Sequence, residues 1–224
     1  MGRLSGKTDF SAVLADRRWL APGILEFRLR RPDGFIFIPG QFLRFTVDEF
    51  QRDYTMVSRP EAQTIDFCIA VADGGRFSSA IQQARIGRRF QVSGPLGHFI
   101  YQRTANPAVF VATGTGVAPF VAFCRGGLDR ALLLHGVRHP DGLIYRNVLA
   151  PAVQPYVACI GRPATILEDG IEVYAGRVTD YLKSELAPGP YDFYLCGRRD
   201  MIRDVTAVID GRFGDSRLFI ENYD

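Results

Sequence analysis

The four consecutive residues from Arg52 to Thr55 combine side chains that suit a phosphorylated, planar ligand. An arginine can clamp a phosphate, a tyrosine such as Tyr54 can stack on a flat ring, and a hydroxyl can hydrogen-bond the edge of that ring. Tyrosine and threonine also favour strands, so the same tetrapeptide is typical of an ordinary half-exposed strand. The residues therefore indicate either a plain strand or one wall of a cofactor site.

A glycine-rich turn follows an apolar strand candidate farther along the chain. Residues 108–112 lead through Thr113 into Gly114 and Gly116, and then into Pro119 and an apolar helix. Glycines let the backbone approach a pyrophosphate, and a helix N-terminus supplies free amides and a favourable dipole. A tight strand-to-helix connection without any ligand is the alternative interpretation of this turn.

The four cysteines lie far apart in the sequence and form no Cys-x-x-Cys pair, so they lack the local spacing of zinc or iron–sulfur ligands. We therefore expect no metal site. This cysteine usage suits a reducing cytoplasm, and the first residues lack the apolar core of a signal peptide. Glycines and Pro119 interrupt the longest apolar stretch, from Ala108 to Phe123, which argues against a membrane span. The sequence predicts a soluble, cytoplasmic protein.

The overall composition allows a sizeable core and argues against nucleic-acid binding. The 224 residues are 47% hydrophobic, enough for one large or two small domains. Lysine and arginine total 27 against 24 acidic residues, and the net charge of +3 is a slight excess. The arginines are scattered and not interleaved with aromatic residues, as a groove for single strands would require.

The spacing of apolar residues changes near a polar stretch that ends at Pro107, which divides the chain into two halves. Up to about Tyr101, short alternating runs such as 24–29, 42–47 and 65–71 are separated by proline and glycine, which predicts an antiparallel barrel or sandwich over residues 1–102. One short helix is expected over 78–84.

From Ala108 onward, apolar runs alternate with helical segments, a pattern that favours a parallel sheet covered by helices over residues 103–224. The expected strands cover residues 108–112, 131–135, 156–160 and 191–195.

Five segments resemble the ordered motifs of the ferredoxin-NADP reductase superfamily. The flavin motif of that family reads Arg-x-Tyr-Ser/Thr, and its nicotinamide motif reads Gly-Thr-Gly-x-x-Pro. The corresponding segments of this chain are residues 52–55, 75–78, 94–99, 114–119 and 196–201. The resemblance covers nearly the whole chain. It implies a β-barrel domain that binds FAD, followed by an α/β domain that binds NAD(P).

The resemblance implies a role for each residue at the flavin. Arg52 would bind a flavin phosphate, Tyr54 would stack on the ring system, and Thr55 would hydrogen-bond near the reactive nitrogen. Gly75, Arg76 and Ser78 would close around the pyrophosphate, which favours FAD over FMN.

The resemblance also implies the nucleotide site. The residues expected to contact NAD(P) are Thr113, Gly114, Gly116, Pro119, Arg138, Arg162, Arg177 and Gly197. Among them, Arg162 and Arg177 would hold the 2′-phosphate of NADP, although solvated surface arginines are the default interpretation.

Three further residues are expected at the hydride-transfer site. Cys196 would lie beside the nicotinamide carbon that gives up hydride, and Glu221 and Tyr223 would contribute from the tail, where Tyr223 could cover the flavin. The alternatives are a small buried strand residue at position 196 and a frayed terminus.

The function implied by the resemblance is an FAD-dependent reductase. It would take hydride from NAD(P)H and pass electrons to ferredoxin, flavodoxin or an oxygenase component on a separate polypeptide. NADP is the expected nucleotide, with NAD as the alternative. Two other functions stay open: an NAD(P)H-dependent flavin reductase that releases reduced flavin, and a non-catalytic flavin-binding subunit of a larger redox complex.

Overall fold

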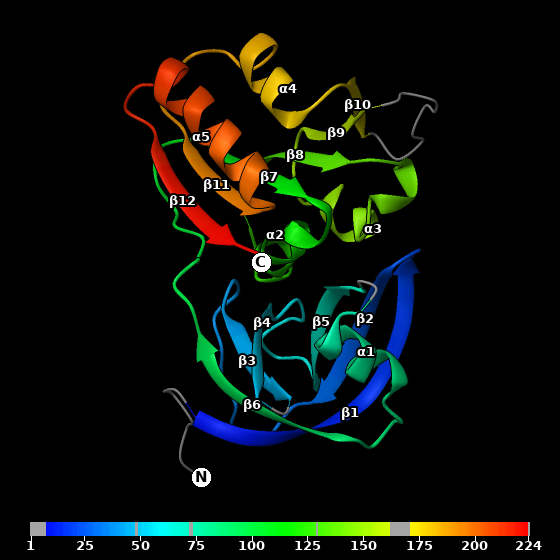
Figure 1. The fold of residues 1–224 in the computed structure, drawn as a ribbon. Coiled ribbons are helices and arrows are strands. Elements are labelled where there is room, and N and C mark those ends of the chain that lie inside the picture. The colour runs from blue at the N-terminus through cyan, green and yellow to red at the C-terminus, as the bar shows by residue number, and fades with distance from the viewer. Residues whose placement is uncertain (1–7, 48, 72–73, 129, 162–170, 224) are drawn as a thin grey trace. The chain divides into compact units, whose positions relative to one another are not determined.

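The computed structural model describes residues 8–47, 49–71, 74–128, 130–161 and 171–223 (Figure 1). The chain divides into two compact units, Met1–Tyr101 and Gln102–Asp224. Within the described ranges, no helix is both long enough and apolar enough to cross a membrane.

The first unit is a six-stranded antiparallel sheet in the order β4-β3-β6-β1-β2-β5. Its strands are β1 Thr8–Ala21, β2 Ile24–Arg30, β3 Phe42–Val47, β4 Phe50–Thr55, β5 Thr64–Ala70 and β6 Arg89–Leu96. The long strand β1 pairs with β6 through its first half and with β2 through its second half, so the sheet curls. Beyond the end of β4, the Val57 amide donates to the Asp66 carbonyl of β5 at 2.8 Å. This half-barrel confirms the antiparallel fold predicted for the first half.

Aromatic side chains fill the inside of the curled sheet. Phe27, Phe45 and Phe67 are fully buried, and their ring centroids lie 5.0–5.6 Å apart. The helix α1 (Arg76–Gln83) adds Phe77 and Ile81 to this core. It begins two residues before the expected Ser78, because the extended backbone of Gly75 forms its N-cap.

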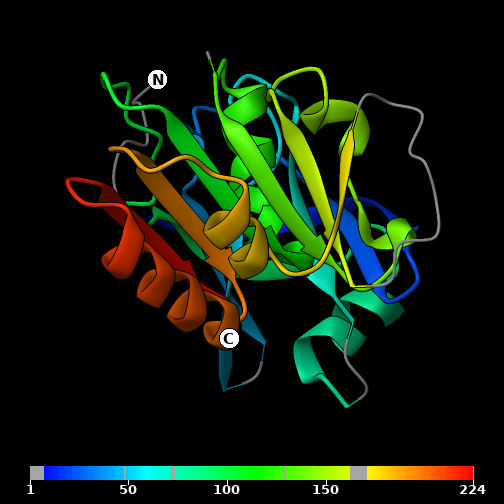
Figure 2. The same cartoon turned by 90° about the horizontal axis from the view of Figure 1, so that it is seen from above.

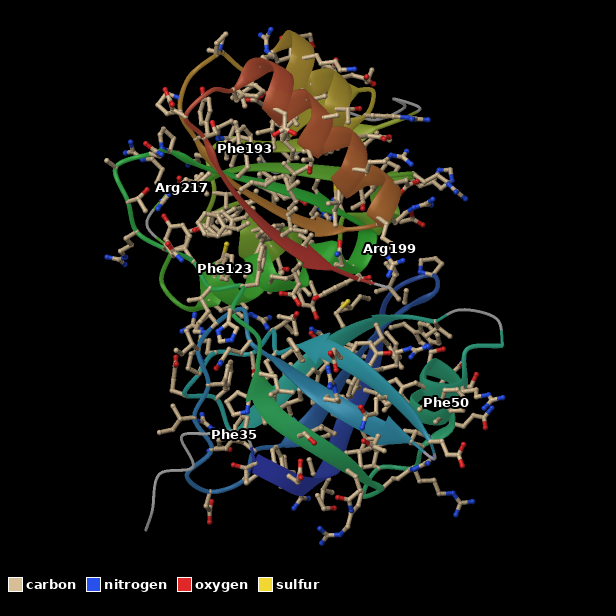
Figure 3. All side chains as sticks on the ribbon, turned by 60° about the vertical axis from the view of Figure 1, so that its left-hand side comes forward. Phe35, Phe50, Phe123, Phe193, Arg199 and Arg217 are labelled. Atoms are coloured by element: carbon tan, nitrogen blue, oxygen red, sulfur yellow. The ribbon has the colours of Figure 1, made fainter. Side chains whose placement is uncertain are left out.

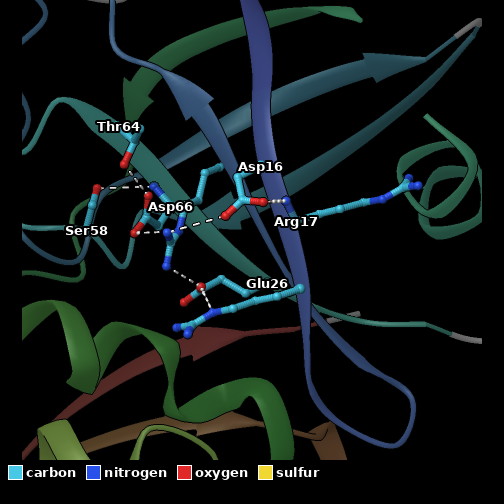
Figure 4. A network of polar contacts seen from close by, with 8 residues as sticks. Asp16, Arg17, Glu26, Ser58, Thr64 and Asp66 are labelled. Atoms are coloured by element: carbon cyan, nitrogen blue, oxygen red, sulfur yellow. Dashed lines mark hydrogen bonds and ion pairs between the residues drawn. The ribbon is translucent and has the colours of Figure 1, made fainter. Parts of the chain in front are cut away.

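An ion-pair network ties together the strands β1, β2 and β5 (Figure 4). Arg18 and Arg28 both donate to Oε2 of Glu26, at 2.6 and 2.9 Å. Arg28 Nε lies 3.6 Å from Asp66, and the Thr64 hydroxyl donates to the same carboxylate at 2.7 Å. Charged groups on neighbouring strands thus support the pairing that curls the sheet.

The second unit is a six-stranded parallel sheet in the order β10-β9-β8-β7-β11-β12, which confirms the predicted α/β fold. Its strands are β7 Ala108–Thr113, β8 Leu132–Val137, β9 Tyr156–Ile160, β10 Glu172–Ala175, β11 Asp192–Gly197 and β12 Arg217–Asn222. The helical elements are η1 Gly114–Val117, α2 Ala118–Arg125, η2 Pro140–Gly142, α3 Arg146–Leu149, α4 Val178–Ser184 and α5 Arg199–Arg212. The helices α4 and α5 cover one face of the sheet, and α2 and α3 cover the other (Figures 1 and 2).

The last strand, β12, was not expected from the sequence. It pairs in parallel with β11 and begins at Arg217, whose Nε donates to Asp192 at 2.8 Å. Thr104 and Asn106 donate to the same carboxylate at 2.6 and 3.1 Å. Burial alone raises the pKa of Asp192, but the hydrogen bonds from Arg217, Thr104 and Asn106 outweigh it and hold the pKa below its usual value. The carboxylate therefore anchors the terminal strand.

Candidate functional site

The strand β4 presents Arg52 and Tyr54 on one face of the curled sheet. The antiparallel register places Arg52 opposite Phe45 and Tyr54 opposite Leu43, so both lie on the side of the apolar core. Arg52 is exposed, and its guanidinium donates to the neighbouring Gln51 carbonyl at 2.8 Å. This arrangement leaves its guanidinium accessible to a ligand phosphate.

Packing against aromatic neighbours, not an ion pair, fixes the position of the Tyr54 ring. Its ring stacks on Phe77 of α1, with centroids 4.9 Å apart and planes inclined by 26°. Burial raises the pKa of Tyr54 to about 12, although the charge of Arg52 opposes the shift. The phenol therefore stays neutral at physiological pH. Thr55, the next residue, is buried, and by strand alternation it lies on the opposite face from Tyr54.

The start of α1 completes this group of residues. Ser78 is buried and its hydroxyl donates to the Gly75 carbonyl at 3.1 Å. In the described structure no side chain caps the helix start, and its first turn carries no acidic residue. Its free amides and dipole therefore suit an anion. Arg76 lies over the Phe50 ring of β4, at 4.2 Å from the centroid, so the helix start and the strand adjoin.

These residues fit FAD. Tyr54 offers a neutral flat surface, Arg52 a cation, and α1 an uncapped N-terminus. The neighbouring Gly74 is open, since a methyl group there would meet no atom within 4 Å. The residues that the sequence assigned to the flavin lie on two adjoining elements: Arg52, Tyr54 and Thr55 on β4, and Gly75, Arg76 and Ser78 at the start of α1. The contacts of Phe50 with Arg76 and of Tyr54 with Phe77 join these elements, whereas the Thr55 side chain lies on the opposite face of β4.

In the second unit, the glycine-rich turn interlocks with the end of β11. A methyl group at Gly116 would stand 2.6 Å from the Cys196 carbonyl carbon. Gly197 has a positive φ of +142°, and a methyl group there would lie 3.0 Å from the Thr113 amide nitrogen. The Arg198 amide donates to the Thr113 hydroxyl at 3.2 Å. Gly197 therefore packs directly against Thr113, the last residue of β7, and this contact alone requires a glycine at position 197.

Cys196 lies beside the terminal strand, where the parallel register pairs it with Glu221. It is fully buried. Burial raises the pKa of the Cys196 thiol, the charge of Glu221 raises it further, and a side-chain hydrogen bond with Tyr223 opposes both effects. Cys196 is therefore a neutral thiol, and the three residues expected at the hydride-transfer site lie together.

A shallow hollow lies at this end of the second unit. It has a volume of about 590 Å³ and is lined by Arg198, Arg199, Asp200 and Tyr223. The two arginines belong to the start of α5, where Arg199 projects from the ribbon in Figure 3. Arg198 is paired with Asp200 at 2.8 Å. Tyr223, expected at the hydride-transfer site, thus lines this hollow together with the start of α5.

The arginines expected at the nucleotide lie at the carboxyl edge of the parallel sheet. Arg138 is exposed directly after β8, and Arg177 is exposed between β10 and α4. The Arg177 amide donates to Asp180 at 3.0 Å, which positions its backbone. The strands are parallel, so both residues share an edge with Gly114. Arg162 lies outside the described residues.

The sequence interpretation assigned no role to His135, which lies under the glycine-rich turn. It is fully buried on β8, and its Nδ1 lies 2.8 Å from the Tyr156 hydroxyl. Its Nε2 has no hydrogen bond of normal geometry within the described residues. Burial lowers the pKa of His135 to about 4, while the nearby backbone of Gly114 opposes the shift. The imidazole is therefore neutral. The sequence gives one indication of this site: His135 is a single polar residue inside the apolar run Leu132–Val137.

Two family models match the chain in succession. Residues 21–101 match the oxidoreductase FAD-binding domain, and residues 110–207 match the oxidoreductase NAD-binding domain.

Curated relatives include a reductase of similar length and longer electron-transfer proteins. Ferredoxin--NADP reductase B of Sorangium cellulosum is 28% identical over 96% of this chain and 98% of its own length. The toluate 1,2-dioxygenase electron transfer component of Pseudomonas putida is 28% identical over 91% of this chain and 64% of its own length. The reductase component of the naphthalene 1,2-dioxygenase system of the same species is 31% identical over 82% of this chain. The chain spans only 58% of that relative and less than two thirds of the toluate protein.

Solved structures share the two-part fold. A ferredoxin NADP+ reductase from Neisseria gonorrhoeae with bound FAD and NADP superposes with a TM-score of 0.83 at 21% identity, over 96% of this chain and 98% of that one. The ferredoxin reductase in carbazole 1,9a-dioxygenase gives 0.80 at 18% identity, over 99% of this chain and 71% of that one. The chain belongs to the ferredoxin-NADP reductase superfamily, with an FAD-binding domain followed by an NAD-binding domain.

Proposed function

We propose that this chain is an FAD-dependent NAD(P)H oxidoreductase that passes electrons to a separate carrier protein, such as ferredoxin or flavodoxin, or to an oxygenase component. One observation carries the proposal: at one end of the parallel sheet, the glycine-rich turn packs against Cys196, and Cys196 pairs with Glu221 on the neighbouring strand. That arrangement accompanies an FAD-binding domain on the same chain.

The residues of the first domain bind and orient the flavin. Arg52 and the start of α1 offset the charge of the pyrophosphate. Tyr54 packs against the ring system as a neutral aromatic surface, and Thr55 holds a hydroxyl near its reactive edge. FAD, when bound, supplies the conversion between a two-electron hydride donor and one-electron acceptors.

The residues of the second domain orient the nicotinamide nucleotide. Thr113, Gly114, Gly116 and Pro119 form the turn that receives its phosphates, and Arg138 adds a cation at the same edge of the sheet. Arg162 and Arg177 favour NADP through its extra phosphate, with NAD as the alternative. Their side chains supply the positive charge that a 2′-phosphate requires.

Cys196 and Gly197 form the floor of the hydride-transfer site. A neutral thiol fills space beside the nicotinamide without adding charge or reacting as a nucleophile. Such a floor holds the ring in an orientation suited to transfer. Glu221 and Tyr223 border the same place and exclude water from it.

The names of the relatives support an electron carrier as the acceptor. Several are dioxygenase electron-transfer components, and another is a ferredoxin–NADP reductase. The test is reduction of purified ferredoxin and flavodoxin by NADPH, followed through cytochrome c. We expect carrier-dependent electron flow while FAD stays on the protein. Release of reduced flavin into solution, without specificity for a carrier, would instead support the flavin reductase. Bound FAD that NADPH does not reduce would support a non-catalytic subunit.

A further inference from the structure

We propose that Phe50 and Arg76 form the site on which the adenine ring of FAD stacks, and that this pair gives the chain its preference for FAD over FMN. The inference rests on the proposed function, because it requires FAD as the cofactor. It assigns a role to the outer end of β4, which neither the motifs nor the family resemblance had assigned.

The first argument is the order of side chains along β4. Phe50, Arg52 and Tyr54 alternate along the strand and pair with Val47, Phe45 and Leu43, so they share one face. The four residue-to-residue steps from Phe50 to Tyr54 span about 13 Å. Along that length an aromatic ring, a cation and a second aromatic ring follow one another. FAD has the matching chemical order: adenine, pyrophosphate and isoalloxazine.

The second argument is the exposure of Phe50. Its exposed fraction is 39%, whereas Phe45 and Phe77 on the same side of the sheet are buried. Figure 3 shows Phe50 at the margin of the first unit, away from the core that holds Phe35. One face of the Phe50 ring is covered by the guanidinium of Arg76, at 4.2 Å from the centroid. An exposed aromatic ring and an arginine plane are both surfaces on which nucleobases stack.

The third argument is the placement of α1 between the two aromatic positions. Arg76 contacts Phe50 at one end of β4, and the next residue, Phe77, stacks on Tyr54 at the other. The helix start therefore adjoins the middle of the strand, where Arg52 is exposed. A pyrophosphate held there by Arg52 and the helix amides leaves one aromatic surface on each side of it.

FMN ends at its phosphate and has no adenine, so it uses Tyr54 and Arg52 but not Phe50. This difference separates the adenine site from the rest of the flavin site. The test measures dissociation constants of FAD and FMN for the apoprotein by isothermal titration calorimetry. The variants are Phe50→Ala and Phe50→Tyr. Trp19→Ala is the control, since it removes another exposed aromatic side chain of the same domain.

We expect Phe50→Ala to raise the dissociation constant of FAD about 5- to 150-fold, the range for loss of one base–aromatic stack. The FMN constant should stay within about twofold, which also shows that the variant folds. Phe50→Tyr and the Trp19→Ala control should keep the FAD constant of the parent. Equal effects of Phe50→Ala on FAD and FMN, or no effect on either, would overturn the adenine site and leave the proposed function standing. A parent protein that binds no FAD would overturn both.

Discussion

Gly116 packs against Cys196 so closely that a methyl group at position 116 would stand 2.6 Å from the carbonyl carbon of Cys196. Real Cβ atoms essentially never come this near to backbone. The turn that follows β7 and the last residues of β11 therefore form one rigid surface, although they lie far apart in the sequence. The nucleotide motif and the cysteine–glycine motif depend on each other.

Gly116→Ala should lower the unfolding free energy by about 1–3 kcal/mol, the usual cost of overpacking, and should weaken NADPH binding. The alanine must push the turn away from β11. Gly211→Ala is the matched control, because Gly211 lies in α5 with no atom within 4 Å of an added methyl group. That variant should be neutral or stabilised by about 0.5–1 kcal/mol. Urea unfolding and NADPH titration measure both, and a Gly116→Ala protein as stable as the parent would show that the turn yields without cost.

His135 should make stability depend on pH. Its pKa falls from 6.5 to about 4 on folding, because burial opposes the charged ring. Between these values only the unfolded chain binds the proton, so the unfolding free energy decreases as the pH falls, by about 3 kcal/mol in total. Above the unfolded pKa this stabilisation is fully present.

The comparison for His135 is urea unfolding of the parent and of His135→Gln between about pH 7 and pH 4.5. The loss of stability on acidification should be smaller in His135→Gln. His139→Gln, which changes an exposed histidine four residues away, should keep the slope of the parent. Identical slopes in the parent and His135→Gln would mean that the imidazole is protonated in the folded state.

Asp192→Asn should destabilise the protein by about 2–3 kcal/mol, since Arg217, Thr104 and Asn106 all donate to this buried carboxylate. The pKa of Asp192 is lowered on folding, so its stabilisation is present above the unfolded value and is lost as the pH falls through the folded value. Amide hydrogen exchange should show the greatest loss of protection in β12. Asp204→Asn, at the exposed pair with Arg203, should change stability by less than about 1 kcal/mol. Equal effects of the two substitutions would remove the anchoring role of Asp192.

The thiol of Cys196 should resist alkylation in the folded protein. It is fully buried and its pKa is raised, so little thiolate forms. Cys124, which is only partly buried and whose pKa burial raises to about 12, should be the first cysteine modified by iodoacetamide. Peptide mass spectrometry before and after denaturation measures the order. Rapid labelling of Cys196 in the native protein would contradict the neutral, enclosed floor of the hydride-transfer site.

The spacing of apolar residues along the sequence was enough to predict that the first half forms an antiparallel sheet and the second half a parallel one. Side chains alternate in the antiparallel strands of the first half, while β7 and β9 are buried on both faces and appear as continuous apolar runs. The strands β1, β10 and β12 were not predicted, because charged residues such as Arg17, Glu172 and Glu221 interrupt their apolar patterns. Their pairing depends on partners far away in the sequence.

The parts of the candidate site that lie in one continuous motif could be predicted from the sequence. The parts that depend on contacts between distant segments could not. Residues 52–55 and 114–119 could be recognised as they stand. In contrast, the contact of His135 with Tyr156 joins two strands, and the stack of Arg76 on Phe50 joins a helix to a strand. Neither pair has a sequence spacing that identifies it.

Anaerobic titration of the purified, FAD-containing protein with NADPH, and separately with NADH, tests the central claim most directly. The visible absorbance of the oxidised flavin reports the reaction. The proposed function predicts that stoichiometric NADPH bleaches the flavin rapidly, and that NADH does so only at higher concentration. If FAD is bound but neither nucleotide bleaches it, the chain is not an NAD(P)H oxidoreductase.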